Sequence, residues 1–307
     1  MIDLAKLHVF LYCAENASFS KAAKLLHVSQ PTVSHHIKLL ERELGAALFD
    51  RSGGELKLTE AGRILLPRAR KLLRDSIAVE QMMGSLDDRV VGHLRIACST
   101  TTGKYILPQF AARFRQRHRH VQISIRRCTA SHVVSRLLNE DANLGVVSYD
   151  ACTDGLDCQH FFTDHIILIA PAHHPWVEHD AIDPSDLLGT PMIIREPESG
   201  TRQVLLAELG AHDISLDDLD IFLEVGNAEA IVRAVEAGFG VSFVSYIAAA
   251  CAIERGTIVR IPIRDFDLRR NIYMIRRELR SANRALEAFW AFVHDPANSD
   301  LLHLAEI

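Results

Sequence analysis

The sequence predicts an N-terminal winged helix-turn-helix followed by a long linker helix, and then an α/β domain made of two lobes. Three observations predict this fold class. Three short helical patterns and a glycine-centred hairpin fill residues 1–58, and one long apolar stripe extends from Glu60 to about Leu86. From His93 onward, apolar runs typical of strands alternate with amphipathic helical patterns. A length of 307 residues agrees with more than one folding unit.

The helix predicted from Gln30 to Leu44 has the strongest start and stop signals in the chain. Ser29 is an N-cap residue, Pro31 lies in the first turn, and Gly45 suits a left-handed stop. One face is apolar, with Val33, Ile37, Leu40 and Leu44 at steps of three and four residues. The opposite face carries hydrogen-bonding side chains, namely Gln30, Thr32, Ser34, His35 and Lys38. A helix of this kind fits the DNA major groove.

Two further helices and a hairpin complete this N-terminal domain. Residues 4–16 form the first predicted helix, and we expect Ser20 to cap the second. Leu48–Arg51 and Glu55–Leu58 alternate around a serine and two glycines, which predicts a pair of short strands. Three helices and a hairpin form a winged helix-turn-helix. The alternative is a small helical bundle with no nucleic-acid partner, and the charge distribution argues against it.

Charge is unevenly distributed along the chain. The net charge of the whole sequence is −5, yet residues 20–74 hold 11 Lys and Arg against 5 Asp and Glu. Residues 91–307 hold 21 and 28, so the rest of the chain is acidic. A basic segment attached to an acidic body favours a local contact with nucleic acid over a chain that coats polyanions along its whole length.

The line AENASFSKAAKLLHVSQPTVSHHIKLLERELGAALFDRSGGELKLTEAG resembles the N-terminal domain of LysR-type transcriptional regulators, and the resemblance is dense over residues 4–66. It implies that the second helix of the motif recognises DNA and that the wing contacts the minor groove or backbone. Two departures stand out: His35-His36 replaces a basic or amide pair, and Glu55 lies in the wing. Carried over by position, the DNA-facing residues are Ser29, Gln30, Thr32, Ser34, His35, Lys38, Arg51 and Lys57.

The long helix from Glu60 to about Leu86 carries a broad apolar stripe that needs a partner, and Thr59 can cap it. In the resembled family this helix pairs two subunits, so we expect a homodimer or a homotetramer. The alternative is that the stripe packs on its own domain. The predicted domains are therefore residues 1–58 for DNA binding, 59–91 for the linker helix and hinge, and 92–307 for effector binding.

The third region contains eight predicted strands and suggests a mainly parallel sheet. Two crossings between the halves resemble the periplasmic-binding-protein architecture, which is also that of the LysR effector domain. Lobe I would hold about 92–164 and 266–296, and lobe II about 165–265. The predicted strands are His93–Cys98, Val121–Cys128, Leu144–Val147, Ile166–Ala170, Met192–Arg195, Ile221–Val225, Val241–Val244 and Leu268–Ile275.

Three loops between a strand and a helix are rich in hydroxyl groups. Ligands bind beyond the carboxyl ends of strands in open α/β sheets, and the N–H groups at helix starts favour anions. The alternative is that these residues only cap their own helices. The candidate effector-binding residues are Ser99, Thr100, Thr101, Thr102, Thr129, Ser131, Ser199, Gly200, Thr201 and Arg202.

The family resemblance and the helix starts contribute differently to that set. The resemblance implies effector contacts at Ser99, Thr100, Thr101, Thr129 and Thr201. Arg202 is added because its guanidinium could donate two parallel bonds to an anion. The expected co-inducer is a small anion, such as an inorganic oxyanion or a compact carboxylate or phosphate metabolite.

No sequence motif supports a catalytic or metal-dependent reading. GxSxG, HExxH and P-loop patterns are absent, so we expect no catalytic residues and no enzyme. Histidines such as His118 and His120 lack a compact ligand spacing, so we expect no metal and no cofactor. Cys152 and Cys158 have no adjacent Lys or Arg to lower a thiol pKa, which disfavours a redox pair. Three other cysteines lie in apolar patterns typical of a core: Cys13, Cys98 and Cys251.

The remaining expectations concern location and partners. Met1 leads directly into an amphipathic helix, no apolar run is long enough for a bilayer, and no CxxC pair is present, so a cytoplasmic protein with reduced thiols is expected. Its partners would be double-stranded DNA with a dyad, a second copy of the chain, and RNA polymerase, but no membrane. A solute-binding protein or an enzyme with an accessory helical head is the alternative function.

Overall fold

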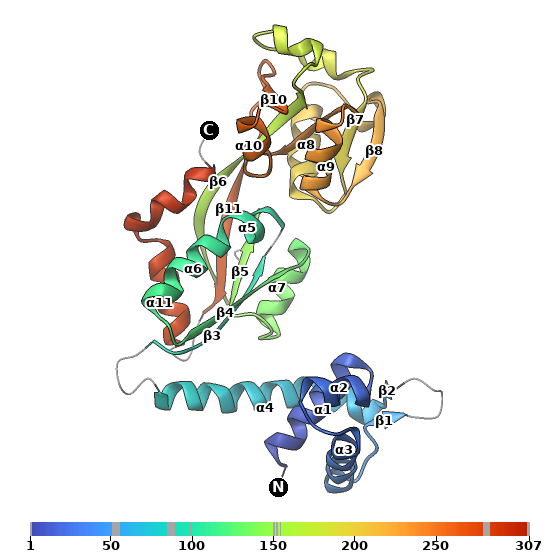
Figure 1. The fold of residues 1–307 in the computed structure, drawn as a ribbon, viewed down its shortest axis with the longest axis vertical. Coiled ribbons are helices and arrows are strands. Elements are labelled where there is room, and N and C mark those ends of the chain that lie inside the picture. Colours follow the sequence, from blue (N-terminus) through green and yellow to red (C-terminus); the bar gives the residue numbers. More distant parts are fainter. Residues whose placement is uncertain are drawn as a thin grey trace. The chain divides into compact units, whose positions relative to one another are not determined.

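The computed structural model describes residues 2–50, 56–84, 90–98, 100–149, 151, 153, 155–278 and 283–305. The chain forms two compact units, Met1–Asp88 and Arg89–Ile307 (Figure 1). Each unit has its own hydrophobic core. The long linker helix belongs to the first unit. Among the described residues, no helix combines the length and the apolar composition that crossing a bilayer requires.

Three helices form the body of the first unit: α1 (Leu4–Asn16), α2 (Phe19–Leu25) and α3 (Gln30–Leu44). Ala22 and Ala23 are both buried, and such small side chains permit α2 to pack closely on its neighbours. The core residues that are fully shielded from solvent include Leu7, Phe10, Cys13, Val33, Ile37 and Leu40. The apolar face predicted for the third helix is therefore the face that it buries.

The caps of these helices confirm one prediction and correct another. The Ser29 hydroxyl accepts a hydrogen bond from the Thr32 backbone N–H at 3.3 Å, and Gly45 ends α3 at φ +68°. The cap of α2 is Ser18, whose hydroxyl accepts from the Lys21 N–H at 3.2 Å, so the prediction of Ser20 was wrong. Because α2 begins at Phe19, Ser20 already lies inside its first turn.

The predicted wing is present, with shorter strands than expected. Strand β1 (Phe49–Asp50) pairs antiparallel with β2 (Lys57–Leu58). Residues 51–55 lie outside the described part of the chain, and the predicted site residue Arg51 is among them. Helix α4 (Glu60–Gly84) follows, with the Thr59 hydroxyl accepting from the Gly62 N–H at 3.1 Å, so the predicted cap is confirmed.

The apolar stripe of α4 is divided between two surroundings. Ala69 is fully buried and Leu65, Leu66 and Leu73 pack against the same core, so this side docks on its own unit. A neighbouring row, formed by Ile64, Leu72 and Val79, leaves 44–58% of each residue exposed. Part of the stripe therefore packs on its own unit, and this second row lies in solvent.

The second unit begins with the first part of lobe I. Its strands are β3 (Gly92–Cys98), β4 (Val121–Arg127) and β5 (Leu144–Val147). Helices α5 (Thr100–Tyr105), α6 (Leu107–Arg117) and α7 (Ala130–Leu138) connect and cover them, and α11 (Arg284–Val293) returns to this lobe at the end. The core of lobe I includes Phe110, Phe114 and Phe289, whose rings are shielded from solvent.

Lobe II repeats the same strand–helix alternation. Its strands are β7 (Met192–Arg195), β8 (Ile221–Val225), β9 (Val241–Ser245) and β10 (Ile258–Ile261), and its helices are α8 (Gly200–Ala211), α9 (Ala228–Glu236) and α10 (Tyr246–Glu254). Short 3-10 helices occupy Pro175–Glu178, Pro184–Leu187 and Leu216–Asp218, and a longer one, η5 (Pro296–Ala305), lies near the C-terminus.

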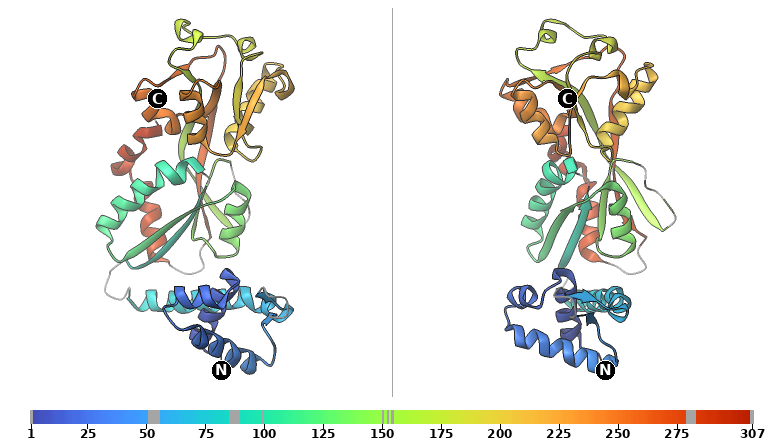
Figure 2. Two further views of the ribbon diagram at one scale, coloured as in Figure 1. Left: turned by 45° about the vertical axis from the view of Figure 1, so that its right-hand side comes forward. Right: turned by 90° about the vertical axis from the view of Figure 1, so that its right-hand side faces the viewer.

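Two long strands cross between the lobes: β6 (Leu156–Pro171) and β11 (Arg269–Arg277) (Figures 1 and 2). They pair with each other antiparallel, from Arg269 opposite His165 to Arg277 opposite Leu156. The resulting strand order is β4-β3-β5-β11-β6-β9-β7-β8, with β10 on β6. Each lobe has a parallel part, but the crossing strands make the whole sheet mixed, which corrects the prediction of a mainly parallel one.

Candidate functional site

The outer face of α3 presents the side chains predicted to contact DNA. Ser29, Gln30, His35 and Lys38 are exposed, and Thr32 and Ser34 are partly exposed. The Ser29 and Thr32 hydroxyls lie 2.8 Å apart and hydrogen-bond to each other. Lys57 on β2 is exposed as well. The face is therefore a row of donors and acceptors beside the apolar side that holds the helix to its core.

Two further exposed residues lie near the start of α3, and one of them, Val28, had a place in the core by its apolar pattern. Val28 and Pro31 both lie in solvent beside the donor row. Apolar side chains at this place suit contact with thymine methyl groups in a major groove. Their signal in the sequence was an apolar residue that does not fit the buried spacing of the helix.

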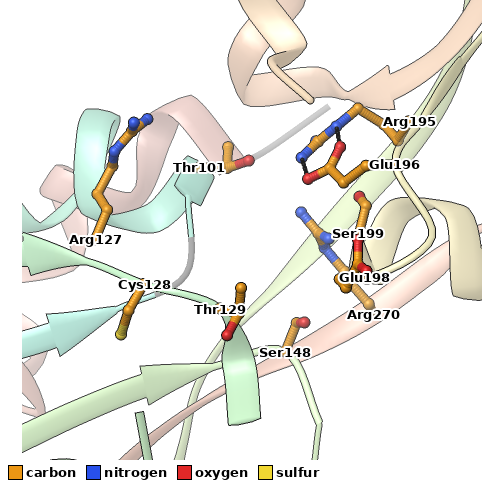
Figure 3. A pocket seen from close by; sticks show the side chains of 11 residues that line it. Thr101, Arg127, Cys128, Thr129, Ser148, Arg195, Glu196, Glu198, Ser199 and Arg270 are labelled. Carbon is orange, nitrogen blue, oxygen red and sulfur yellow. Dashed lines mark hydrogen bonds and ion pairs between the residues drawn. The ribbon is translucent and has the colours of Figure 1, made fainter. Parts of the chain in front are cut away.

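In the second unit, a pocket of about 310 Å³ opens between the two lobes (Figure 3). Lobe I supplies residues at the carboxyl ends of its parallel strands, and lobe II supplies the loop between β7 and α8. Arg270 is contributed by the crossing strand β11. The lining residues are Thr101, Arg127, Cys128, Thr129, Ser148, Arg195, Glu196, Glu198, Ser199, Gly200 and Arg270.

The start of α8 contributes Ser199 and Gly200 to the lobe II wall of the pocket. The Ser199 hydroxyl caps the helix by accepting from the Thr201 N–H at 3.3 Å. A Cβ atom on Gly200 would lie 2.6 Å from the Ser148 hydroxyl and 3.2 Å from Nη1 of Arg270. A larger residue here would therefore displace the side chains of Ser148 and Arg270, which approach the helix start closely.

A buried ion pair lies beneath this helix start. Arg270 donates to Oδ2 of Asp164 through Nε at 2.8 Å and Nη2 at 2.7 Å. Its third nitrogen, Nη1, donates to the Thr201 hydroxyl at 3.2 Å. Asp164 is 1% exposed and also accepts from the Ser245 hydroxyl at 2.6 Å. The pair thus joins both crossing strands to α8 and to the end of β9.

The two other arginines of the pocket have different surroundings. Arg195 is 5% exposed and donates twice to Glu196, at 2.7 and 2.8 Å. Arg127 is exposed at the end of β4, and no carboxylate of the described residues lies within ion-pair distance of it. Arg127 is therefore the pocket arginine without a carboxylate at ion-pair distance among these residues, although its charge helps to lower the pKa of Glu229.

The structure brings together four of the predicted effector-binding residues: Thr101, Thr129, Ser199 and Gly200. Thr201 lies just behind them and is buried. Thr102 is buried and does not line the pocket. The Ser131 hydroxyl hydrogen-bonds to the Thr129 hydroxyl, but Ser131 does not line the pocket either. Ser99 lies outside the described residues, and of Thr100 only its place at the start of α5 is described.

Arg202 is the predicted residue whose placement must be corrected. Its Nη1 donates to the Arg195 carbonyl at 2.9 Å and to Glu224 at 2.6 Å, and it does not line the pocket. As the third residue of α8, it points back along the helix toward strands β7 and β8. It braces the lobe II wall instead of presenting donors to a ligand.

Several lining residues were not predicted. Arg127 and Arg195 end two parallel strands, and Ser148 directly follows a third, so their position beyond strand ends was an available signal. Arg270 had no comparable signal, because it lies within an antiparallel strand and reaches the pocket only through the crossing of β11.

The cysteines and histidines are the candidate residues for a metal or redox centre. No group of three His, Cys, Asp or Glu side chains there is arranged to hold a metal ion. Cys152, the possible redox partner of Cys158, lies outside the described residues. Cys128 lines the pocket, and burial raises the pKa of its thiol. Cys251 is exposed, which corrects its assignment to the core.

Two family sequence models match this chain. Residues 4–63 match "Bacterial regulatory helix-turn-helix protein, lysR family", and residues 87–297 match "LysR substrate binding domain". The second match covers the unit that contains the pocket, and the first covers the helix-turn-helix and the wing.

Curated relatives match nearly the whole chain. An uncharacterised HTH-type transcriptional regulator of Methanocaldococcus jannaschii is 32% identical over 94% of this chain and 98% of its own length. A probable RuBisCO transcriptional regulator of Nostoc is 31% identical over 99% of this chain and 92% of its own. The transcriptional activator CmpR of Synechocystis is 28% identical over 96% and 97%.

Solved structures share the fold. Full-length CbnR in complex with its target DNA aligns with 95% of this chain and 99% of its own, with a TM-score of 0.71 and 23% identity. The Synechocystis CcmR regulatory domain, in complex with 2-PG, aligns with 66% of this chain and 95% of its own, with a TM-score of 0.60 and 25% identity. Because both family models match and the larger match spans more than half of the sequence, the chain belongs to the LysR family of transcriptional regulators and carries that family's effector-binding domain.

Proposed function

We propose that this regulator responds to a small anion bound in the pocket between its lobes. The observation that carries the proposal is the guanidinium of Arg127 in a lining with three arginines and two carboxylates, Glu196 and Glu198, where Asp164 beneath the pocket neutralises Arg270. Two of the arginines already have carboxylate partners, and Arg127 has none among the described residues. Hydroxyl groups from both lobes and the start of α8 add neutral donors around this positive charge.

An anion in this position would contact both lobes at once. Arg127, Thr101 and Thr129 approach it from lobe I, and Ser199 with the N-terminal turn of α8 approaches it from lobe II. A ligand shifts a conformational equilibrium only through its different affinities for the two states. Contacts with both lobes supply such a difference, because they are complete only when the lobes are close together. The CcmR regulatory domain, a relative of similar fold, is an example bound to 2-PG.

The test is calorimetry with a panel of ligands: inorganic oxyanions, small carboxylates, sugar phosphates and neutral aromatics. We expect one of the anions to bind, and Arg127→Gln to weaken it by about 1.5–3 kcal/mol, the usual contribution of a charged hydrogen bond. Arg115→Gln is the matched control, because Arg115 is an exposed arginine of lobe I that does not line the pocket. Binding of only a neutral or cationic ligand, unchanged in Arg127→Gln, would contradict the proposal.

We further propose that α3 enters the major groove of a partly palindromic duplex and that the protein acts as an even oligomer. The exposed row of Ile64, Leu72 and Val79 on α4 supports pairing with a second copy, because its seven- and eight-residue steps keep one helix face apolar. Two-fold protein symmetry then requires half-sites about one turn (~10 base pairs) apart, or a multiple. Light scattering of the protein–DNA complex tests this, and a monomer on one half-site would contradict it.

The remaining parts of the proposal concern the setting of this activity. A regulator acts by helping or hindering RNA polymerase at the promoter, so polymerase is a further partner, and the site of action is the cytoplasm. In the lining, the Thr129 hydroxyl lies 2.6 Å from Nδ1 of the exposed His132, and for this pocket we propose ligand sensing without catalysis. Incubating the anion identified by calorimetry with the protein should return it chemically unchanged.

A further inference from the structure

Two helices meet across the lobes beside the pocket. Tyr105, the last residue of α5 in lobe I, donates its hydroxyl hydrogen to Oε1 of Glu229 at 2.6 Å. Glu229 lies in the first turn of α9 in lobe II, and its other oxygen pairs with Lys104 of α5. One carboxylate of lobe II is thus held by two adjacent side chains of lobe I.

Each side of this contact is anchored in its own lobe. The Tyr105 ring packs against the core of lobe I. The Glu229 backbone N–H donates to the Asn227 side chain at 2.8 Å, which fixes the start of α9. The bonds from Lys104 and Tyr105 hold the pKa of Glu229 below its usual range, so the carboxylate is ionised near neutral pH. Hydrogen bonds to a charged acceptor are stronger than neutral ones.

The contact and the pocket share one short helix and one arginine. Helix α5 has six residues, and Thr101 near its start lines the pocket while Lys104 and Tyr105 lie one turn later. Arg127 of the pocket also contributes to the low pKa of Glu229, so the two charges interact. A movement of α9 relative to lobe I would therefore reach the pocket through α5.

We propose that Lys104, Tyr105 and Glu229 form an interlobe latch that positions α5, and with it Thr101, for the ligand and holds the lobes together before the ligand arrives. The role of the latch in ligand binding rests on the pocket function proposed above. The latch itself acts in the ligand-free protein. The apparent affinity of a ligand falls with the fraction of molecules whose binding site is not assembled, and the latch keeps that fraction small.

The experiment is hydrogen–deuterium exchange of the full-length, ligand-free protein, followed separately for residues 100–105 and 228–236. Tyr105→Phe removes one hydroxyl and keeps the ring, so the core packing stays. We expect about a tenfold faster exchange in both α5 and α9, the size expected from losing one charge-assisted hydrogen bond. Tyr273→Phe is the control, because Tyr273 lies in lobe I on β11 and does not contact Glu229.

A second pair of variants separates latching from ordinary helix stability. Lys104→Gln should raise exchange in both helices, whereas Lys104→Arg keeps the charge and should restore most of the protection. Faster exchange confined to α5 in these variants, or wild-type exchange in Tyr105→Phe, would overturn the latch. The measurement uses no ligand, so a failure to find any bound anion would refute the proposed effector and leave this result intact.

Discussion

The ion pair between Asp164 and Arg270 offers a direct test of how the two lobes are joined. Asp164→Asn keeps the shape of the side chain but removes the negative charge that faces Arg270. The exposed fractions of the two side chains are 1% and 9%, so neither charge is screened by water. The substitution leaves an arginine buried without its counter-charge, and the two crossing strands lose their strongest polar link.

The size of the effect follows from this burial. Removing one partner of a buried pair costs about 3–5 kcal/mol, because the remaining charge keeps its desolvation penalty. For a unit of about 200 residues, each kcal/mol lowers Tm by roughly 2–4 °C, so Asp164→Asn should lower the transition of the second unit by about 6–20 °C. Asp183→Asn breaks an exposed pair with Arg264 and should change stability by less than about 1 kcal/mol.

Differential scanning calorimetry of the full-length protein provides the assay. The double variant Asp164→Leu with Arg270→Met removes both charges and should regain most of the lost stability, since apolar residues of similar volume replace buried pairs well. A loss of less than about 1 kcal/mol in Asp164→Asn would refute the reasoning. A double variant no more stable than Asp164→Asn would show that the uncompensated charge is not the cause.

Three further predictions concern other parts of the chain. Gly200→Ala should destabilise the second unit by about 1–3 kcal/mol through the contact with Ser148, and adding Ser148→Ala should restore part of the loss in urea unfolding. Lys38→Ala should weaken all duplexes alike and reduce the salt slope by about 1, whereas Gln30→Ala should alter the selected base motif; identical motifs would contradict the assignment. Burial lowers the pKa of His294 and of His93, so the unfolded state binds protons more readily than the folded state. Tm should therefore fall as the pH drops from about 6.5 toward about 5, and His294→Gln should reduce that fall.

Local signals were sufficient for most of the first unit. The Ser29 cap, the Gly45 stop and the buried face of α3 depend on residues within one or two turns of each other, so the sequence contains the whole cause. The cap of α2 shows the limit of this reasoning, because Ser18 and Ser20 are both good caps. Which serine becomes the cap depends on Phe19, whose ring centroid lies 5.5 Å from that of Phe49 in the wing. That contact joins residues remote in sequence.

The sequence predicted the loops that line the pocket but not which arginines line it. Hydroxyl groups after strand ends indicated Thr101, Thr129 and Ser199, and all three line the pocket, because every parallel strand places its following loop at the same edge of the sheet. The cations depended on pairing, which the sequence did not reveal. Arg202 was expected in the pocket and instead bonds to Glu224, and Arg270 came from a strand with no ligand signal.

This pairing also limits what the pocket can recognise. Arg195 and Arg270 each donate two hydrogen bonds to a carboxylate. A ligand that displaced those bonds would leave a buried carboxylate without its counter-charge, which is energetically costly. Arg127, which has no carboxylate partner among the described residues, can meet a negative group without that cost. The volume of about 310 Å³ lies at the lower end of the range for ligand pockets. The proposed effector is therefore a compact ligand, with one anionic group facing Arg127 and neutral acceptors facing the start of α8.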